Sequence, residues 1–169
     1  SNNQLVNDIA AFFQQRIFSL LEEKGVDADL VQSVSGKNIS INRLLNNPND
    51  VKHRAFLLMN LRESGQLAKI QSVVTRAAKL AEKSSLEMTV LSPCNYVDPN
   101  LFEKESELQM LNVIKTLEPL VVELDHGCYE KIAEGLISSS KALSSFFDGE
   151  DSVLVMTDNE LLRENRLNL

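Results

Sequence analysis

Four basic side chains recur along the stretch of sequence from residue 66 to residue 83. They are Lys69, Arg76, Lys79 and Lys83. At about 100° per residue they fall on one side of a helix, opposite an apolar stripe. The stripe consists of Leu67, Ile70, Val74, Ala77 and Ala81. With a rise of about 1.5 Å per residue, the four charges span roughly 20 Å, which is enough to touch several phosphates of a single-stranded loop. The alternative is an exposed basic face that only keeps the protein in solution.

Two arginines, Arg54 and Arg62, precede this stretch, and Lys52 and His53 lie beside the first of them. Arginine suits RNA binding because its planar fork can pair with a phosphate and can also stack on a base. Sequence-specific RNA contacts mostly reach loops whose bases are splayed out. The predicted RNA-binding residues are therefore Arg54, Arg62, Lys69, Arg76, Lys79 and Lys83. We expect Lys69→Ala or Arg76→Ala to weaken RNA binding without unfolding the chain.

The distribution of charge indicates one basic region on an acidic background. The 169-residue chain has a net charge of −7. The segment from Lys37 to Lys83 contains nine Lys and Arg residues and three acidic residues, a net charge of +6. The rest of the chain contains eight basic and twenty-one acidic residues, a net charge of −13. Such an asymmetry is typical of an oriented electrostatic surface. The alternative is that these cations are ordinary solvated helix faces.

The sequence offers little for catalysis or metal binding. His53 and His126 lie far apart, and neither has an acidic or cysteine partner at ligand spacing. No glycine-rich phosphate loop occurs, and the serine run 138–140 has no nucleophile elbow around it. We therefore predict no catalytic residue and no metal site. The chain has only two cysteines, so we expect no disulfide and a reducing, cytoplasmic compartment. It has no apolar run of about 18 residues, so we expect no membrane span.

Most of the sequence has the three- and four-residue apolar spacing of amphipathic helices. The first helix is expected to end at Gly25, because glycine suits the left-handed cap. Asp27 is expected to cap the second helix. Asn47-Pro48 is a helix start signal, since Asn caps helices and Pro fits the first helical position. The predicted fold class is therefore all-α, a helical bundle with little or no strand.

Further signals predict where the later helices begin and end. Asp98-Pro99 is expected to open a helix that Pro119 breaks or kinks. Residues 128–147 are expected to form one helix, and a capping box, Thr157-x-x-Glu160, is expected to start the last one. Residues 84–97 lack helical period, so this loop is the candidate boundary if the single domain has two lobes.

The carboxyl-terminal residues form an ordered signature. Phe146-Phe147-Asp148 is followed by Val153-Leu154-Val155-Met156, by Asp158 and by Asn165-Arg166-Leu167. This order resembles the end of the beta subunit of bacterial-type glycyl-tRNA synthetase, which is an anticodon-binding domain of the DALR type. Three earlier blocks resemble the same family in the right order. They are Phe13-x-x-Arg16 with Leu20-Leu21, Gly25 and Asp29-Leu30-Val31; Thr75-Arg76-Ala77-Ala78-Lys79-Leu80; and Asp98-x-x-Leu101-Phe102 with Ser106-Glu107.

The resemblance implies that residues 1–169 form one α-helical domain that binds the anticodon of glycine tRNA and performs no bond chemistry. The whole enzyme would join glycine to its tRNA, with ATP and magnesium bound in the catalytic subunit, so this chain would hold no cofactor. Its partners would be glycine tRNA, the remaining beta-subunit domains and the alpha subunit, with no membrane and no DNA. Ser1-Asn2 reads as an expression-tag remnant, and the chain stops at Leu169 where the family's closing helix would continue, so we expect an excised domain.

Two other interpretations stay open. The first is the anticodon-binding domain of another synthetase, such as the arginyl type, which shares the helical architecture. The second is a helical protein–protein interaction module whose acidic surface meets a partner subunit. Within the family interpretation, Arg163 and Arg166 are expected to anchor the last helix rather than read bases, and Arg16 is expected to form a structural ion pair.

Overall fold

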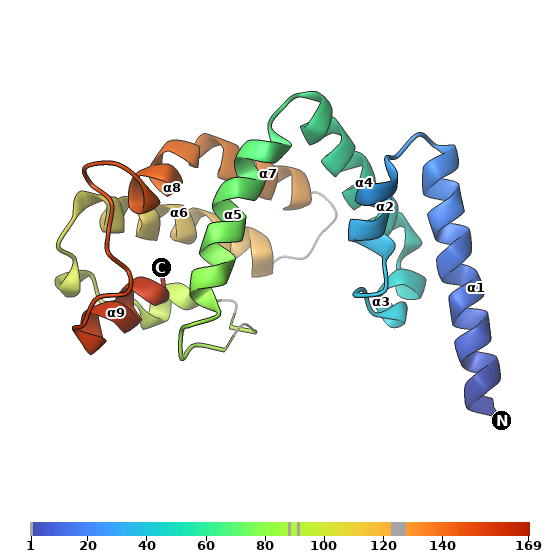
Figure 1. Ribbon diagram of the computed structural model, residues 1–169, viewed down its shortest axis with the longest axis horizontal. Coiled ribbons are helices and arrows are strands. Elements are labelled where there is room, and N and C mark those ends of the chain that lie inside the picture. The colour runs from blue at the N-terminus through green and yellow to red at the C-terminus, as the bar shows by residue number, and fades with distance from the viewer. Residues whose placement is uncertain (1, 88, 91, 123–127) are drawn as a thin grey trace. The chain divides into compact units, whose positions relative to one another are not determined.

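The computed structural model describes residues 2–87, 89–90, 92–122 and 128–169. Within these ranges the regular elements are α-helices and short 3₁₀ turns, with no strand, so the predicted all-α fold class is confirmed (Figure 1). The chain divides into two compact units, Ser1–Leu67 and Ala68–Leu169. Each unit has its own buried core, and each is described by itself below.

The first unit contains four helices. They are α1 (Asn2–Glu23), α2 (Ala28–Ser35), α3 (Ile41–Asn46) and α4 (Pro48–Glu63). Two predicted helix boundaries are confirmed. Gly25 has φ 84°, the left-handed conformation expected after α1. The Asn47 side chain accepts a hydrogen bond from the Asp50 amide, with Pro48 in the first turn, so Asn47-Pro48 does start α4.

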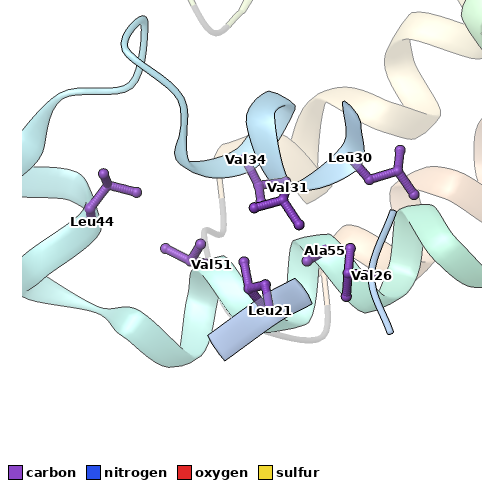
Figure 2. Close-up of a cluster of buried hydrophobic side chains, with 8 residues drawn as sticks. All are labelled: Leu21, Val26, Leu30, Val31, Val34, Leu44, Val51 and Ala55. Atoms are coloured by element: carbon purple, nitrogen blue, oxygen red, sulfur yellow. The ribbon is translucent and has the colours of Figure 1, made fainter. Parts of the chain in front are cut away.

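Eight apolar side chains form the core of the first unit (Figure 2). They are Leu21, Val26, Leu30, Val31, Val34, Leu44, Val51 and Ala55. They come from the end of α1, from the turn that follows it (Val26), from α2 and α3, and from the first half of α4, so the core joins all four helices. Complete burial of a Val or Leu side chain contributes about 1.5–3 kcal/mol, and Val31, Leu44 and Val51 are all fully buried.

The second unit is built around α6. Its helices are α5 (Leu67–Ala81, whose first residue ends the first unit), α6 (Glu105–Val122), α7 (Cys128–Ser138), α8 (Ser140–Phe147) and α9 (Glu160–Leu167), with 3₁₀ turns η1 (Pro93–Tyr96) and η2 (Pro99–Leu101). Helix α6 packs against α7 and α8. The core consists of Met110, Val113, Leu143, Phe146, Val155 and Leu167. Val73 and Leu80 of α5 pack against this core, and so place α5 on the surface of the unit.

A buried ion pair joins α9 to the start of α6. Arg166 of α9 donates from Nε to Glu107 Oε1 of α6 at 2.8 Å, and from Nη2 to Glu103 Oε2 at 2.8 Å. The Arg166 side chain is 4% exposed and the Glu107 side chain is fully buried. The other Glu107 oxygen accepts the amides of Glu103 and Lys104, and Arg166 Nη1 donates to the Leu154 carbonyl. The expected anchoring role of Arg166 is thereby confirmed.

The predicted lobe boundary in residues 84–97 lies inside the second unit, because side-chain hydrogen bonds tie this segment to α6 and α9. Ser84 and Ser85 bond Asn168 and Glu164, and the Cys94 amide donates to Glu118. The division between the compact units falls earlier, between residues 67 and 68.

Four local predictions are wrong in detail. The Asp98 side chain accepts a hydrogen bond from the Asn100 amide, as a capping residue does. The element that it starts is only the turn η2, and α6 begins at Glu105. Helix α6 continues through Pro119 to Val122, so the predicted break does not occur, whereas a kink at this proline stays a prediction. Ile114 and Leu117, just before the proline, pack against the core. A turn at Ser139 divides the expected helix over 128–147 into α7 and α8. The cap of α9 is Asn159, which accepts from Leu162, rather than Thr157.

No helix in the described ranges is long and apolar enough to cross a membrane.

We predict that Arg166→Ala lowers the free energy of unfolding by about 3–5 kcal/mol, because it leaves the Glu107 carboxylate buried without its counter-charge. Urea denaturation followed by circular dichroism measures this change. Arg163→Ala on the same helix is the control, since among the described residues Arg163 donates only to the Thr157 carbonyl, and loss of that bond costs about 1 kcal/mol. Equal losses from the two variants would contradict the anchoring role.

Candidate functional site

Helix α5 is the most basic element of the second unit. It carries Lys69, Arg76 and Lys79, with Lys83 in the turn that follows, and it contains no acidic residue. None of its residues is fully buried, because only one side of the helix packs against the core. The four cations are all exposed, as expected for a charged side. The apolar side differs in part from the predicted stripe: Val74 is 43% exposed, whereas Val73 and Leu80, which lie outside that stripe, pack against the core.

Arg76 is held by the end of α8. Its Nη1 donates to Asp148 Oδ2 at 2.6 Å, its Nη2 donates to the Phe147 carbonyl at 3.2 Å, and its guanidinium lies 4.9 Å from the centre of the Phe147 ring. The two charged side chains are 47% and 65% exposed, so the pair contributes little to stability. Its effect is to fix the direction of the Arg76 side chain.

Unlike Arg76, the three lysines of this stretch form no ion pair with any residue that the structure describes. They are Lys69, Lys79 and Lys83. Each ammonium is a compact, strongly hydrated charge on a flexible stem. Such groups can pair with an incoming phosphate without first giving up a partner in the protein.

Arg54 and Arg62 lie in the first unit, in ion pairs. Arg54 Nε donates to Asp50 Oδ2 at 3.0 Å within α4, and both side chains are 13% exposed. Arg54 Nη2 is buried and has no hydrogen-bond partner among the described residues. The Arg54 guanidinium therefore faces the interior of its unit more than solvent.

Arg62 clamps the start of α2 to the end of α4. It donates to Asp27 Oδ2 at 2.7 Å and to Asp29 at 2.8 Å and 2.5 Å. Asp27 was expected to cap α2 with its side chain, but it makes no capping hydrogen bond and binds Arg62 instead. The hydrogen bond from Arg62 lowers the pKa of Asp29 from its ordinary value of 3.8 to about 2.

The six predicted RNA-binding residues thus fall into two sets. Lys69, Arg76, Lys79 and Lys83 share α5 and the turn after it, whereas Arg54 and Arg62 belong to the other unit and hold carboxylates. Arg16, for which we expected a structural ion pair, is exposed and forms none with the described residues.

Several residues beside α5 were missed as candidates from the sequence. A cleft of about 370 Å³ lies between α5 and α8, lined on the α8 side by Ser140, Lys141 and Ser144, and closed by Phe147 and Asp148. Lys69, Ser72, Val73 and Arg76 line it from α5. The serine run had been weighed only as a nucleophile, and nothing local shows that α8 faces α5.

Relatives of known name are similar over the whole chain. The chain is 42% identical over 167 residues to a segment of the glycine–tRNA ligase beta subunit of Picosynechococcus sp., covering 95% of this chain and 23% of that protein. It is 37% identical to the same subunit of Trichodesmium erythraeum, covering 100% of this chain and 24% of that protein. The subunit of Clostridioides difficile is 26% identical, with 98% of this chain covered.

No protein-family model and no solved structure matches the chain. The named relatives support membership in the class of aminoacyl-tRNA ligase subunits. The family that the relatives support is the beta subunit of glycine–tRNA ligase, which is the family of the sequence resemblance. The chain spans about a quarter of the length of the curated relatives it matches.

We predict that Asp29→Asn destabilises the first unit at pH 7, and that its difference from the unsubstituted chain shrinks as the pH falls. The sign follows from the lowered pKa: the ionised form is favoured by folding, so its contribution is complete well above pH 3.8 and is lost as the pH approaches about 2. Urea denaturation between pH 7 and pH 3 measures the difference.

The matching control is made in an Arg62→Ala background, where Asp29→Asn should have almost no effect because the hydrogen-bond donor is gone. A difference that is the same at every pH, or that persists without Arg62, would contradict this account.

Proposed function

We propose that this chain is the anticodon-binding part of a glycine–tRNA ligase beta subunit, and that α5 provides the surface that meets the RNA. The observation that carries the proposal is the charge of α5 against its surroundings. Residues 68–169 contain ten basic and seventeen acidic residues, a net of −7, whereas α5 carries three cations and no acid. The cations are exposed, and on the described part of the helix only Arg76 has a carboxylate partner.

A row of positive charges along one helix suits the binding of an unpaired RNA loop. Lys69 and Lys79 are ten residues apart, which is about 15 Å along a helix axis. Ammonium groups at that spacing can each neutralise a different backbone phosphate of one strand, and each neutralised phosphate releases a counterion. Arg54 and Arg62 take part less directly under this proposal, since their guanidinium groups already hold Asp50, Asp27 and Asp29.

The rest of the proposal concerns the parent protein. Glycine–tRNA ligase beta subunits are about four times as long as this chain, so ATP, magnesium and glycine would be handled elsewhere in the assembly. The proposed partners are glycine tRNA, the remainder of the beta subunit and an alpha subunit, in the cytoplasm. The chain itself would contribute recognition of the correct tRNA rather than a catalytic group.

The test is binding of the 169-residue chain to the anticodon stem-loop of a glycine tRNA, measured by fluorescence anisotropy over a range of salt concentrations. We predict that Lys69→Ala/Lys79→Ala/Lys83→Ala weakens binding and lowers the slope of log affinity against log salt by about 2, since each single-strand contact contributes about 0.7. A fully paired RNA of the same length should bind more weakly than the loop.

The control variant is Lys24→Ala/Lys115→Ala/Lys131→Ala, which removes the same charge from exposed positions off α5. If both triple variants reduce the slope equally, binding is unspecific attraction and the α5 proposal fails. Equal affinity for stem-loops of glycine and arginine tRNAs would count against the choice of tRNA.

A second candidate function is protein–protein contact, and α1 favours it. Six large apolar side chains on this helix are exposed. They are Leu5, Val6, Ile9, Phe12, Phe13 and Leu20. Contiguous exposed apolar surface marks interaction sites in folded proteins. Because the chain spans about a quarter of its relatives, we propose that the remainder of the beta subunit covers this face.

We predict that the chain co-purifies with the remaining part of a relative's beta subunit supplied as a separate polypeptide, and that Phe12→Ser abolishes this association without changing RNA affinity. Leu154→Ser is the control, because Leu154 is equally exposed but belongs to the second unit. Loss of association in both variants, or in neither, would argue against an α1 interface.

A further inference from the structure

The cleft between α5 and α8 combines three cations with three hydroxyl groups. Lys69 and Arg76 line it from α5, and Lys141 lines it from α8. The hydroxyls are those of Ser72, Ser140 and Ser144. Its volume of about 370 Å³ is many times the roughly 10–15 Å³ that a single water needs, so an anion and its remaining water can enter together.

The three cations of the cleft are not equivalent. Neither Lys69 nor Lys141 forms an ion pair with the described residues, and both are exposed. Arg76 is already paired with Asp148, but an Arg side chain has five N–H groups, and its hydrogen bonds to Asp148 and to Phe147 use only Nη1 and Nη2. Arg76 can therefore add a further acceptor without releasing Asp148.

The serine hydroxyls of the cleft are available as donors. Within the described part of the chain, Ser72, Ser140 and Ser144 make no side-chain hydrogen bond. A hydroxyl can rotate to donate to an oxygen that approaches from the cleft. Donors on two facing helices suit an acceptor that presents oxygens in several directions, as a tetrahedral phosphate does.

The net charge of the cleft is +2, since Asp148 offsets one of the three cations. This positive balance attracts a phosphate group. The cationic residues Lys79 and Lys83 continue from the cleft along α5, so a chain of phosphodiesters, rather than an isolated phosphate, fits the arrangement.

We propose that the α5–α8 cleft binds one backbone phosphate of a single-stranded RNA, with Lys69 and Lys141 supplying the charge and Ser72, Ser140 and Ser144 supplying hydrogen bonds. Arg76, held over the Phe147 ring, closes one side of the site. The choice of RNA as the polymer rests on the proposed function, whereas the phosphodiester site rests on the geometry of the cleft alone.

The site can be tested without RNA. Dimethyl phosphate is a singly charged diester with no base, and acetate is the carboxylate comparison. Each is titrated into the ¹⁵N-labelled 169-residue chain at constant ionic strength. We expect dimethyl phosphate to shift the amide resonances of residues 69–76 and 140–148, acetate to shift them less, and Lys69→Gln/Lys141→Gln to abolish the response.

Two further variants separate the contributions. Lys115→Gln/Lys131→Gln removes the same charge from exposed positions outside the cleft and should keep the full response. Ser72→Ala/Ser144→Ala keeps every charge and places a good helix former at two helical positions. It should weaken RNA binding several-fold without changing the salt slope, because no counterion-releasing contact is lost.

The outcomes distinguish this site from the proposed function. If dimethyl phosphate shifts no cleft resonances, or shifts them equally in the Lys69→Gln/Lys141→Gln variant, the cleft proposal is wrong even when the stem-loop binds to α5. If the cleft responds but the stem-loop does not bind, the phosphate site stands and the anticodon function fails. A stronger response to acetate would show that the site prefers carboxylates, and would overturn its assignment to RNA.

Discussion

The second unit depends on the buried pairing of Arg166 with Glu107. A charge removed from water is tolerated only when its partners are close and well oriented, and here α9 supplies the cation while α6 supplies the carboxylate. The same end of α6 holds the segment after α8, because Ser106 donates to the Asp151 side chain and backbone. These bonds fix the segment that follows α8, and the residues at the end of α8, Phe147 and Asp148, orient Arg76 on α5.

Four arginines and the lysines of α5 are used differently, and the difference explains how a site is left open. Arg54, Arg62, Arg76 and Arg166 hold carboxylates, and Arg62 contacts both oxygens of Asp29 through the planar fork of its guanidinium. The lysines of α5 hold none among the described residues. In a unit that is acidic as a whole, these exposed ammonium groups are the positive charges with which a polyanion can form ion pairs. The basic surface is therefore narrower than the run of basic residues in the sequence.

Much of the fold could be predicted because its signals are local. The caps at Gly25 and Asn47, and the amphipathic character of α5, depend on residues within one or two turns of each other. The failures have long-range causes that the local sequence does not show. Pro119 lies inside α6 because the helix is packed on both neighbours, and Asp27 binds a distant arginine instead of its own helix. The loop 84–97 looked like a boundary because its bonds to α6 and α9 involve residues far along the chain.

The sequence by itself determined the all-α class, the family and the existence of a basic helix, since these follow from short-range periodicity and from the order of blocks along the chain. Tertiary structure alone decided which cations pair with a carboxylate and which have no such partner among the described residues. The partners lie 35 residues apart for Arg62 and Asp27, 72 apart for Arg76 and Asp148, and 59 apart for Arg166 and Glu107. The cleft that joins Lys69 to Lys141 arises in the same way. Charge pairing falls steeply with distance, so only the packing of helices can select which opposite charges meet.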